Sequence, residues 1–539
     1  MSDAVPNRLY YGDNLEILRR YIPDESVDLV YLDPPFNSNA NYNVLFAEKD
    51  GTRAASQIRA FDDTWTWDQE DESVYVDLVT AGGKVADVLQ AFRTFLGPCD
   101  MLAYLVMMAP RLIELRRTLK KTGSIYLHCD PTASHYLKML MDAVFRPERF
   151  QHEIIWKRTS GHSDSKTLGN AHDVLLYYSV TDEIVWNKQH QEYDESYIQS
   201  HYRRVDKDGR RYRTDNLTAM GLSGGGYTYE WNGVTKLWRL PESKMKELDG
   251  KGRVHYTKSG SAEYIRYLDE MPGTSLQDVW TDIPPINSQA AERLGYPTQK
   301  PEALLERIIR ASSNEGDTVL DPFCGCGTTI AAAQKLKRVW IGIDITHLAI
   351  TLMRQRLKDA FGDSAPFEVV GEPTSIPDAA ALAESDPYQF QWWALGLVGA
   401  RPAEGKKGAD KGIDGKIVFQ GEYPGEFQSV IISVKAGHVT ANHVRDLRGV
   451  VDREKAAIGV LISMENFTGP MKTEAVTAGF YESATWAKRY ARIQLLTVAD
   501  LLDGRKIDMP PIKQVGATFK KAPKAQGKGH QQQEFLTDS

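Results

Sequence analysis

The 539-residue chain has few cysteines and no long apolar run. Four cysteines are too few to hold a chain of this length in a disulfide framework. Cys324 and Cys326 are separated by one residue and lack a second pair at zinc-ligand spacing, so we expect no metal there. Neither a signal peptide nor a membrane-spanning segment is evident, and Met1 to Arg8 is polar. These absences argue against a secreted or membrane protein and predict a cytoplasmic one.

An excess of positive charge is also missing, because the formal net charge is −7. Affinity for phosphates depends on local fields rather than on the total charge, so this value does not exclude a nucleic-acid binder. The chain is otherwise ordinary globular material, with 42% hydrophobic and 25% charged residues. Its length and composition predict about two to four domains.

The tetrapeptide Asp33-Pro34-Pro35-Phe36 directly follows the apolar run Val27 to Leu32. An aromatic amine is a poor nucleophile, and a site that accepts both of its N–H hydrogen bonds draws the lone pair out of the ring. Asp33 supplies a carboxylate for this purpose, and Pro34 supplies a carbonyl on a stiff backbone. Phe36 offers a flat face for stacking a base. The pattern indicates methylation of an exocyclic amino group; the alternative is a strand that simply ends at a double proline.

A second motif, Asp321-Pro322-Phe323-Cys324-Gly325-Cys326-Gly327-Thr328, joins a strand-like run to a helical stretch. Glycines at such a turn allow the backbone to approach a ligand closely. The next apolar run ends in Asp344, where nucleotide-binding sheets place an acid for ribose hydroxyls. Ile330 stands where the phosphate-binding fingerprint has its third glycine. A ligand with a ribose but no pyrophosphate is therefore favoured over NAD.

These two motifs resemble those of the DNA amino-methyltransferases that use S-adenosylmethionine. The cofactor motif follows the tetrapeptide in the chain, which is similar to the permuted beta group of that family. Further matches are Gly12 to Glu16, Tyr126 to Asp130 and Tyr296 to Pro301. The resemblance covers about residues 7 to 360.

The resemblance implies roles for individual residues. Asp33, Pro34, Pro35 and Phe36 are the implied catalytic residues. Asp13 is implied to lie near the adenine of the cofactor, and Thr298 to Lys300 near its methionine end. The full set of implied cofactor-binding residues is Asp13, Thr298, Gln299, Lys300, Asp321, Phe323, Gly325, Gly327, Thr328 and Asp344.

We expect an α/β fold. Its parts are a Rossmann-like methyltransferase with a mixed, mostly parallel sheet, a β-rich recognition insertion, and a second, smaller α/β domain of restriction-endonuclease-like type. The expected boundaries are 1–180 for the catalytic half, 181–285 for the insertion, 286–362 for the cofactor-binding half, 363–387 for a linker, 388–508 for the second domain and 509–539 for a disordered tail.

Basic residues cluster in the expected insertion, at Arg203, Arg204, Arg210 and Arg211, interleaved with tyrosines. The stretch Asp208-Gly209-Arg210 predicts a hairpin turn. Such a cluster is often only a solvated charged face. Its position between the two halves of a methyltransferase favours contact with double-stranded DNA.

The C-terminal part contains Asp414 and, further on, Ser433-Val434-Lys435, which resembles the PD-(D/E)xK restriction-endonuclease fold. In that fold two acidic groups hold Mg²⁺ and a lysine assists hydrolysis. Asp414 and Lys435 fit this pattern as a nuclease remnant, but Ser433 occupies the position of the second acid, and a hydroxyl is a poor substitute. A degenerate DNA-binding or partner-binding module is favoured over an active nuclease, which alone would need Mg²⁺. An unrelated α/β domain is the third alternative.

The resulting hypothesis is a site-specific DNA methyltransferase of restriction-modification or epigenetic type that acts on N6 of a flipped-out adenine. By the resemblance, N4-cytosine enzymes tend to begin the tetrapeptide with serine, so Asp33 favours adenine. Cytosine C5 methylation is disfavoured, because Cys99 lacks the glutamine that usually follows such a nucleophile. An N4-cytosine methyltransferase, a single-chain methyltransferase-endonuclease, an RNA substrate and a non-catalytic DNA-binding module stay open as alternatives. A homodimer and a separate restriction subunit are both compatible with the resemblance.

Overall fold

The computed structural model describes residues 7–35, 67–159, 168–219, 226–287, 290–294, 296, 298–403, 412–421, 427–484 and 487–510. The chain divides into two compact units. The larger unit comprises residues 1–187 and 278–539, and the smaller unit comprises residues 188–277. The smaller unit falls inside the segment 181–285 that we expected to be an insertion.

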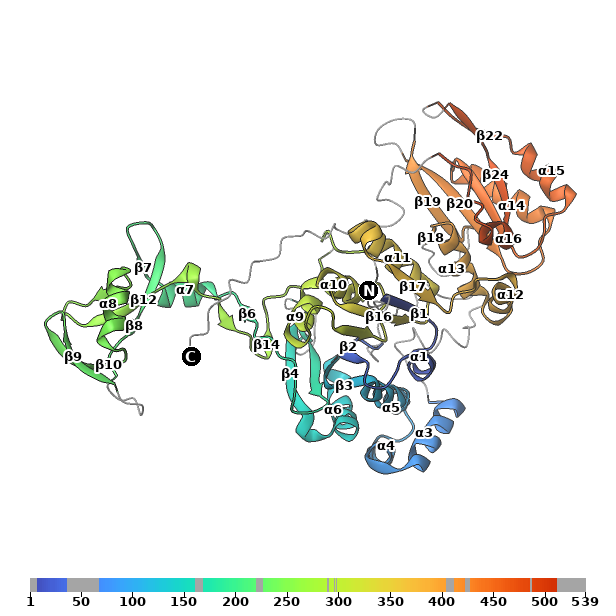
Figure 1. The fold of residues 1–539 in the computed structure, drawn as a ribbon. Helices are drawn as coiled ribbons and strands as arrows, with labels where there is room; N and C mark the ends of the chain where they lie inside the picture. The colour runs from blue at the N-terminus through green and yellow to red at the C-terminus, as the bar shows by residue number, and fades with distance from the viewer. Residues whose placement is uncertain are drawn as a thin grey trace, which may run out of the picture. The chain divides into compact units, whose positions relative to one another are not determined.

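The described strands of the larger unit include a nine-stranded sheet in the order β14-β4-β5-β3-β2-β15-β16-β1-β17 (Figure 1). Within it β5 runs antiparallel to both of its neighbours, and every other neighbouring pair is parallel. This is the mixed, mostly parallel sheet that the sequence predicts. The strands are β1 (Asn7–Tyr11), β2 (Val27–Leu32), β3 (Leu119–Cys129), β4 (Phe150–Lys157), β5 (His172–Ser179), β14 (Val279–Trp280), β15 (Thr318–Asp321), β16 (Val339–Asp344) and β17 (Phe367–Val370).

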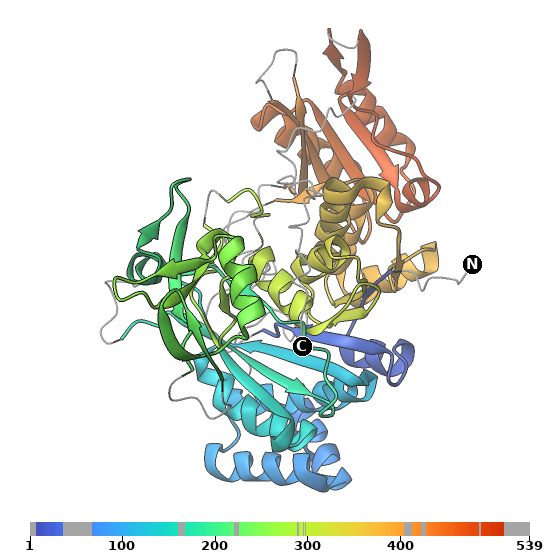
Figure 2. The same ribbon diagram turned by 60° about the vertical axis from the view of Figure 1, so that its left-hand side comes forward.

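Helices cover both faces of this sheet. Leu105 of α5 and Leu137 of α6 share one apolar cluster with Leu127 of β3, so these helices cover one face (Figure 2, cyan). Tyr126 points to the other face, because its hydroxyl lies 2.7 Å from the Ser312 hydroxyl of α9. The helices are α1 (Asn14–Tyr21), α3 (Gln69–Ala81), α4 (Gly83–Leu96), α5 (Asp100–Thr118), α6 (Pro131–Phe145), α9 (Glu302–Ser312), α10 (Thr328–Lys335) and α11 (His347–Phe361), with short 3₁₀ turns at Pro147–Arg149 and Gly362–Ser364.

Local sequence signals explain where the elements near the sheet's carboxyl edge begin and end. All six residues of β2 are buried, as expected for a parallel strand covered on both faces. Asp13 caps α1 by accepting a hydrogen bond from the Leu15 amide at 2.7 Å. Asp130 caps α6 in the same way, with the Ala133 amide at 3.1 Å. The chain therefore leaves β1 and β3 through sharp, capped turns that face the same edge of the sheet.

Residues 363–387, which we expected to be a linker, carry regular structure instead. Phe367–Val370 forms β17, which pairs in parallel with β1 at the edge of the sheet. Helix α12 (Ile376–Ser385) follows, and its Ala379 is fully buried in the core of the next domain. The Ser375 side chain caps this helix by accepting a hydrogen bond from the Asp378 amide. The serine, the proline and the acidic residue of this segment therefore form the first turn of a helix.

The C-terminal domain of the larger unit is built on a five-stranded sheet in the order β18-β19-β20-β21-β24 (Figure 1, orange to red). Alternate residues of β20 enter different apolar clusters: Ile432 packs with Phe390 of α13, and Ile431 packs with Val444 of α14. Helices therefore cover both faces of this α/β domain. Its elements are α13 (Pro387–Leu397), β18 (Arg401–Pro402), β19 (Gly415–Gln420), β20 (Phe427–Lys435), α14 (Ala441–Arg453), β21 (Ile458–Ser463), α15 (Gly469–Thr477), β22 (Phe480–Ser483), β23 (Lys488–Ala491), β24 (Ile493–Thr497) and α16 (Val498–Leu502).

The smaller unit is rich in short antiparallel strands around a small core that includes Trp238 and Met245. Asp206 accepts hydrogen bonds from the amides of Asp208 and Arg210, each at 2.9 Å, and this turn joins β7 to β8 as the predicted hairpin. Its elements are β6 (His190–Gln191), α7 (Glu195–His201), β7 (Arg204–Val205), β8 (Arg211–Asn216), β9 (Tyr227–Trp231), β10 (Val234–Trp238), α8 (Glu242–Gly250), β11 (Val254–Tyr256), β12 (Ala262–Tyr267), a 3₁₀ turn (Leu268–Glu270) and β13 (Thr274–Ser275).

Within the described ranges, no helix combines the length and the apolar character needed to cross a membrane.

Candidate active site

A cavity of about 670 Å³ opens at the carboxyl ends of β2, β15 and β16. The carboxyl edge of a parallel sheet is where α/β folds place their ligands. The cavity brings together both sequence motifs, although they are far apart in the chain. Its lining includes Asp13, Asn14, Tyr31, Asp33, Pro34, Pro35, Arg111, Trp156, Arg158, Asp173, Thr298, Gln299, Lys300, Asp321, Phe323, Gly325, Thr328 and Asp344.

Asp33 follows the last residue of β2 and lies next to Lys300. The Lys300 ammonium donates a hydrogen bond to one carboxylate oxygen of Asp33 at 2.6 Å. Both side chains are mostly buried, with 14% and 16% of their surfaces exposed for the lysine and the aspartate. Pro34 and Pro35 line the cavity beside them, whereas Phe36 lies outside the described residues. A contact between Lys300 and Asp33 was not expected from the sequence.

The glycine turn adopts a conformation that requires its glycines. Gly325 and Gly327 have φ values of +49° and +75°, in the left-handed region that other residues rarely adopt. A Cβ atom on Gly327 would also collide with the side chain of Met353. Gly327 directly precedes α10, so the turn aims the start of this helix at the cavity.

Asp344 closes the turn from the end of β16. One of its carboxylate oxygens accepts a hydrogen bond from the Gly325 amide at 2.9 Å. The other accepts from the amide and the hydroxyl of Thr346, at 2.9 and 2.8 Å. Burial raises the pKa of Asp344 to about 6 despite these donors. A carboxylate oxygen has two lone pairs, so the oxygen bonded to Gly325 can accept one more hydrogen bond.

Asp321 lies at the end of the neighbouring strand β15. Burial raises its pKa to about 7, although the Phe323 amide donates to it at 3.0 Å. The charges of Asp33 and Asp344 raise its pKa further. Three carboxyl groups, those of Asp33, Asp321 and Asp344, thus share this edge of the sheet.

Asp13 is engaged by Arg111 of α5. The guanidinium donates to both carboxylate oxygens of Asp13, at 2.9 and 3.1 Å, and to the Asn14 side chain at 2.6 Å. Asn14 in turn donates to the Pro322 carbonyl at 2.8 Å, next to the glycine turn. Arg111 was missed by sequence reasoning, because nothing on a long amphipathic helix distinguishes an arginine that reaches a site from one that faces solvent.

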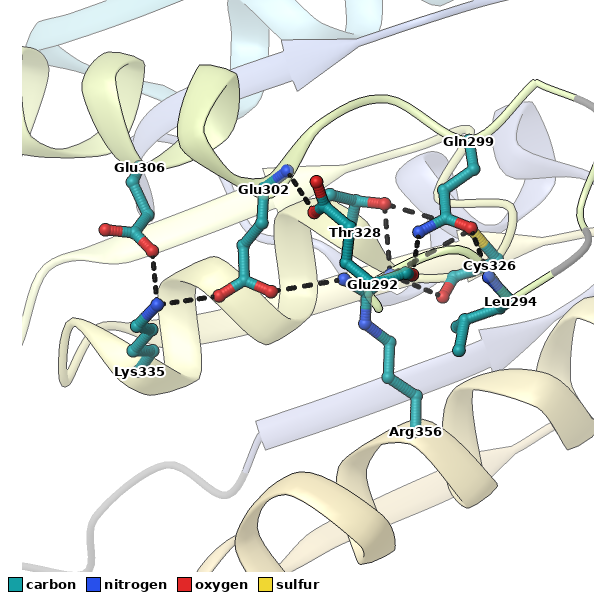
Figure 3. Close-up of polar contacts among 9 residues, drawn as sticks. All are labelled: Glu292, Leu294, Gln299, Glu302, Glu306, Cys326, Thr328, Lys335 and Arg356. Atoms are coloured by element: carbon teal, nitrogen blue, oxygen red, sulfur yellow. Dashed lines mark hydrogen bonds and ion pairs between the residues drawn. The ribbon is translucent and has the colours of Figure 1, made fainter. Parts of the chain in front are cut away.

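The segment before α9 is held by a polar network (Figure 3). The Gln299 side chain accepts from the Leu294 amide at 2.7 Å and donates to the Glu292 carbonyl at 2.6 Å. The amide group of Gln299 therefore shapes its own loop. Gln299 also lines the cavity, and its contact with the cofactor stays a prediction. Thr298 lines the cavity, and Lys300 reaches Asp33 as described.

Arg356 of α11 ties this network to the glycine turn. Its guanidinium donates to the Thr328 hydroxyl at 3.1 Å and to the Cys326 carbonyl at 3.3 Å. It also donates to Glu302 at 3.4 Å, which Lys335 contacts at 2.9 Å (Figure 3). The Thr328 hydroxyl is thus part of the support that holds the turn in shape.

The cavity wall far from the glycine turn contains several residues that the sequence analysis did not identify. Trp156, at the end of β4, donates its indole N–H to the Ile283 carbonyl at 2.9 Å. Asp173, at the start of β5, is 2% exposed and lies 3.3 Å from Arg158. Trp156 and Asp173 are 17 positions apart in the chain, and the pairing of β4 with β5 places them opposite each other at the cavity.

The basic cluster of the smaller unit is only partly available to a partner. Arg210 donates to Asp269 at 2.8 and 2.9 Å and to Glu270 at 2.7 Å, and it stacks over Tyr267. Arg204 contacts His255. Arg203 and Arg211 are exposed. The acidic partners of Arg210 are 59 and 60 positions away, which is why its neutralisation was not foreseen.

The nuclease-like residues of the C-terminal domain do come together. The Lys435 ammonium lies 3.7 Å from the Asp414 carboxylate. Ser433 donates its hydroxyl to the same carboxylate at 3.0 Å, and the Val434 amide donates to it at 2.7 Å. Among the residues that the structure describes, no cluster of three or more histidine, cysteine, aspartate or glutamate side chains could hold a metal ion.

Residues 27–355 match the family model of the N6 and N4 DNA methylases. This is more than half of the chain, and the protein belongs to the DNA methylase family. Residues 388–503 match the family model of the NACHT-associated inactive restriction endonuclease 1. These matches confirm both resemblances that the sequence suggested, the first to DNA methyltransferases and the second to restriction endonucleases.

Among named relatives, the type II methyltransferase M.EcaI of Enterobacter cloacae is 28% identical over 361 residues, which cover 66% of this chain and 70% of the relative. The DNA adenine methyltransferase YhdJ of Escherichia coli is 27% identical over 384 residues, covering 70% and 93%. The Mod subunit of the type III restriction-modification enzyme StyLTI of Salmonella typhimurium is 28% identical over 352 residues, covering 61% and 50%. The solved structure of a DNA modification methylase from Thermus thermophilus covers 68% of this chain and 100% of its own, with 16% identity and a TM-score of 0.33.

Proposed function

We propose that this DNA methylase transfers a methyl group from S-adenosylmethionine to N6 of an adenine flipped out of duplex DNA. The observation that carries the proposal is that Asp33 and Pro34 share one cavity with the glycine turn and Asp344. A donor of methyl groups and an acceptor amine can therefore meet in this cavity. The base has to leave its helix, because a paired amino group is out of reach.

The cavity fits a ligand that has a ribose and no pyrophosphate. Gly325 and Gly327 allow close approach of the ligand to the backbone, and Asp344 keeps an acceptor position for a ribose hydroxyl. Asp321 and Phe323 complete this wall, and Thr298 also belongs to the lining. S-adenosylmethionine also carries a sulfonium charge, which the carboxyl groups of this edge attract. When bound, it supplies an electrophilic methyl group.

In this proposal Asp33 and the Pro34 carbonyl orient the amino group of the base. Each accepts one of its two N–H hydrogen bonds, which turns the nitrogen lone pair toward the methyl donor. Lys300 holds one carboxylate oxygen of Asp33 and leaves the other for the base. We assign Lys300 to this positioning role rather than to the methionine end of the cofactor. Phe36 stacks on the base.

Adenine is the proposed base for two reasons. The tetrapeptide begins with Asp33, whereas N4-cytosine enzymes tend by resemblance to begin with serine. YhdJ, which aligns over 93% of its own length, is named a DNA adenine methyltransferase. N4 of cytosine is the alternative, because the same two acceptors would orient its amino group.

The C-terminal domain is proposed to bind DNA or a partner without cleaving. Ser433 stands where a second carboxylate would be needed, and its hydroxyl hydrogen-bonds to Asp414. One carboxylate is a weak ligand set for Mg²⁺. The family model that this domain matches describes an inactive restriction endonuclease, which supports the same proposal.

The test is to incubate the protein with S-adenosylmethionine carrying a labelled methyl group and mixed-sequence duplex DNA, and to identify the labelled nucleoside. We expect N6-methyladenine with the wild type and none with Asp33→Ala. Asp142→Ala is the matched control, because Asp142 pairs with Lys138 away from the cavity. Label in N4-methylcytosine would overturn the choice of base, and absence of label in DNA would overturn the proposal.

A further inference from the structure

Three buried polar side chains form a chain of hydrogen bonds next to Asp33. The Tyr31 hydroxyl lies 2.8 Å from Nδ1 of His128. Nε2 of His128 lies 3.1 Å from a carboxylate oxygen of Asp173. The three residues are 2%, 0% and 2% exposed, respectively. A buried polar network of this kind needs an explanation, because apolar residues would fill the same space at lower cost.

The strand pairing places this network beside the proposed reaction site. Tyr31 precedes Asp33 by two residues, so the two side chains share one side of the chain at the end of β2. His128 faces Leu175 across β3 and β5, and Asp173 lies two residues before Leu175 on the same face. Tyr31 and Asp173 both line the cavity that contains Asp33.

The network fixes where its protons lie. Burial raises the pKa of Asp173, but the hydrogen bond from His128 and the charges of Lys300 and Arg158 act against burial, and the pKa is lowered overall. Asp173 is therefore ionised and can only accept hydrogen bonds. In a neutral imidazole the proton then sits on Nε2 of His128, and Nδ1 accepts the hydrogen bond that Tyr31 donates. The Tyr31 oxygen keeps its lone pairs.

We propose that Tyr31 accepts the proton that the target amino group must lose, while passing its own proton to His128. This inference rests on the proposed amino-methyl transfer. Formation of the carbon–nitrogen bond, as the methyl group leaves sulfur, gives a nitrogen with two hydrogens, a methyl group and a positive charge. One N–H bond then breaks, its electron pair stays on nitrogen, and the proton moves to the Tyr31 oxygen. The former hydroxyl proton of Tyr31 moves to Nδ1 of His128, and Asp173 stabilises the imidazolium.

The relay avoids a charge that the site disfavours. Burial, and then the charges of Asp33, Asp321 and Asp173, hold the pKa of Tyr31 well above its ordinary value. A phenolate at this position would therefore be costly, whereas a coupled transfer leaves Tyr31 neutral before and after. The positive charge ends on His128, next to a carboxylate, which is the arrangement that a histidine–aspartate pair provides in other enzymes. His128 and Asp173 act through Tyr31 and are positioning residues.

Asp33 is less suited to take this proton. One of its oxygens already accepts from the Lys300 ammonium, and the other is committed to orienting the amino group. The second N–H group of the amine points to the Pro34 carbonyl, which is a very weak base and cannot take the proton. In the relay this N–H group turns from the carbonyl to the Tyr31 oxygen once the nitrogen is tetrahedral, and it releases its proton there. Among the residues of this wall, Tyr31 has a route by which the proton can move on.

The experiment measures single-turnover methyl transfer, with saturating S-adenosylmethionine and duplex DNA, in H₂O and in D₂O. The variants are Tyr31→Phe, Asp173→Asn and the double variant. Tyr126→Phe is the matched control, because it removes a buried hydroxyl bonded to Ser312 outside the cavity lining. Affinity for S-adenosylmethionine is measured for each protein by calorimetry.

We expect Tyr31→Phe to lower the rate by at least about tenfold, in line with the effect of general acid–base groups. The wild-type rate shows a solvent isotope effect, and Tyr31→Phe removes it. The double variant is expected to be no slower than the slower of the two single variants. Tyr126→Phe keeps the wild-type rate. The affinity of every variant for S-adenosylmethionine stays within about twofold of the wild-type affinity.

A Tyr31→Phe rate and solvent isotope effect equal to those of the wild type would overturn the relay. So would an equal loss in Tyr126→Phe, or a loss that merely follows weaker binding of S-adenosylmethionine. Wild-type label in N4-methylcytosine, with Tyr31→Phe still slow, would overturn adenine as the substrate while the relay stands. Absence of methylation by the wild type would overturn both.

Discussion

Lys300 and Asp33 form an ion pair at 2.6 Å across 267 positions of sequence, and this pair joins two distant segments of the chain at the candidate active site. Lys300 belongs to the segment before α9, whereas Asp33 follows β2. The pair orients the carboxylate and keeps one of its oxygens pointing to the cavity. We infer from it that Lys300 positions Asp33.

We predict that Lys300→Met lowers the rate of methyl transfer by at least about tenfold, because Asp33 loses the group that fixes its orientation. Affinity for S-adenosylmethionine, measured by calorimetry, should change by less than about threefold. Lys335→Met is the matched control, since Lys335 pairs with Glu302 and Glu306 and does not line the cavity. A loss of affinity for S-adenosylmethionine with an unchanged maximal rate would instead show that Lys300 binds the methionine end of the cofactor.

The glycine turn allows a test that separates backbone strain from crowding. Gly316→Ala places a Cβ in open space at φ +87°, so we expect a cost of about 1 kcal/mol from the left-handed backbone alone. Gly327→Ala adds a collision with Met353, which should cost about 1–3 kcal/mol more and weaken binding of S-adenosylmethionine. Thermal unfolding and calorimetry measure the two effects. Equal costs at both positions would contradict the close packing of the turn.

The raised pKa of Asp321 makes stability depend on pH. Between about pH 4 and 7 the folded protein keeps a proton on Asp321 that the unfolded chain releases, so this group stabilises the fold at low pH and the contribution is lost as pH rises to about 7. Asp321→Asn cannot lose a proton, and its unfolding temperature relative to the wild type should rise from pH 4 to pH 8 in the absence of ligand. Parallel curves for the two proteins would show that Asp321 ionises normally.

We predict that the wild-type protein does not nick plasmid DNA in the presence of Mg²⁺. Ser433→Asp puts a second carboxylate beside Asp414, and Mg²⁺ should then raise the unfolding temperature of this variant. Ser433→Ala removes the hydroxyl without adding a ligand and should show no response. Nicking by the wild type that is lost in Lys435→Ala would contradict the assignment of an inactive domain.

The arginines of the smaller unit should differ in their effects on DNA binding. Arg211 is exposed, so Arg211→Ala is expected to weaken DNA binding and to reduce its salt dependence by about one counterion. Arg210 is held by Asp269 and Glu270, so Arg210→Ala should affect the stability of the unit more than its DNA affinity. Titrations at several salt concentrations distinguish the two cases. Equal effects on DNA affinity would show that Arg210 leaves its ion pairs to contact phosphate.

Local sequence was sufficient to predict the parts of the site that depend on backbone chemistry. The tetrapeptide from Asp33 and the turn at Gly325 and Gly327 each contain, within a few residues, the stiffness or the left-handed φ that their roles require. The strand before each was predictable from its apolar run. Both features therefore appear where the sequence placed them, at one edge of a mostly parallel sheet.

Contacts between distant residues were not predictable in this way. The Lys300 partner of Asp33 and the Asp173 partner of His128 depend on which strands become neighbours. The same limit explains the expected linker, because Phe367 to Val370 becomes a strand only by pairing with β1, which is distant in the chain. A charge pattern likewise cannot show that Arg210 is neutralised by side chains from another element.

Methylation of adenine N6 is measured most directly in the nucleoside composition of genomic DNA from a host that lacks its own DNA methylases. Mass spectrometry after expression of the wild-type protein should find N6-methyladenine, and expression of Asp33→Ala to the same level should give none. Wild-type DNA that contains N4-methylcytosine instead, or N6-methyladenine that persists in Asp33→Ala, would contradict the account.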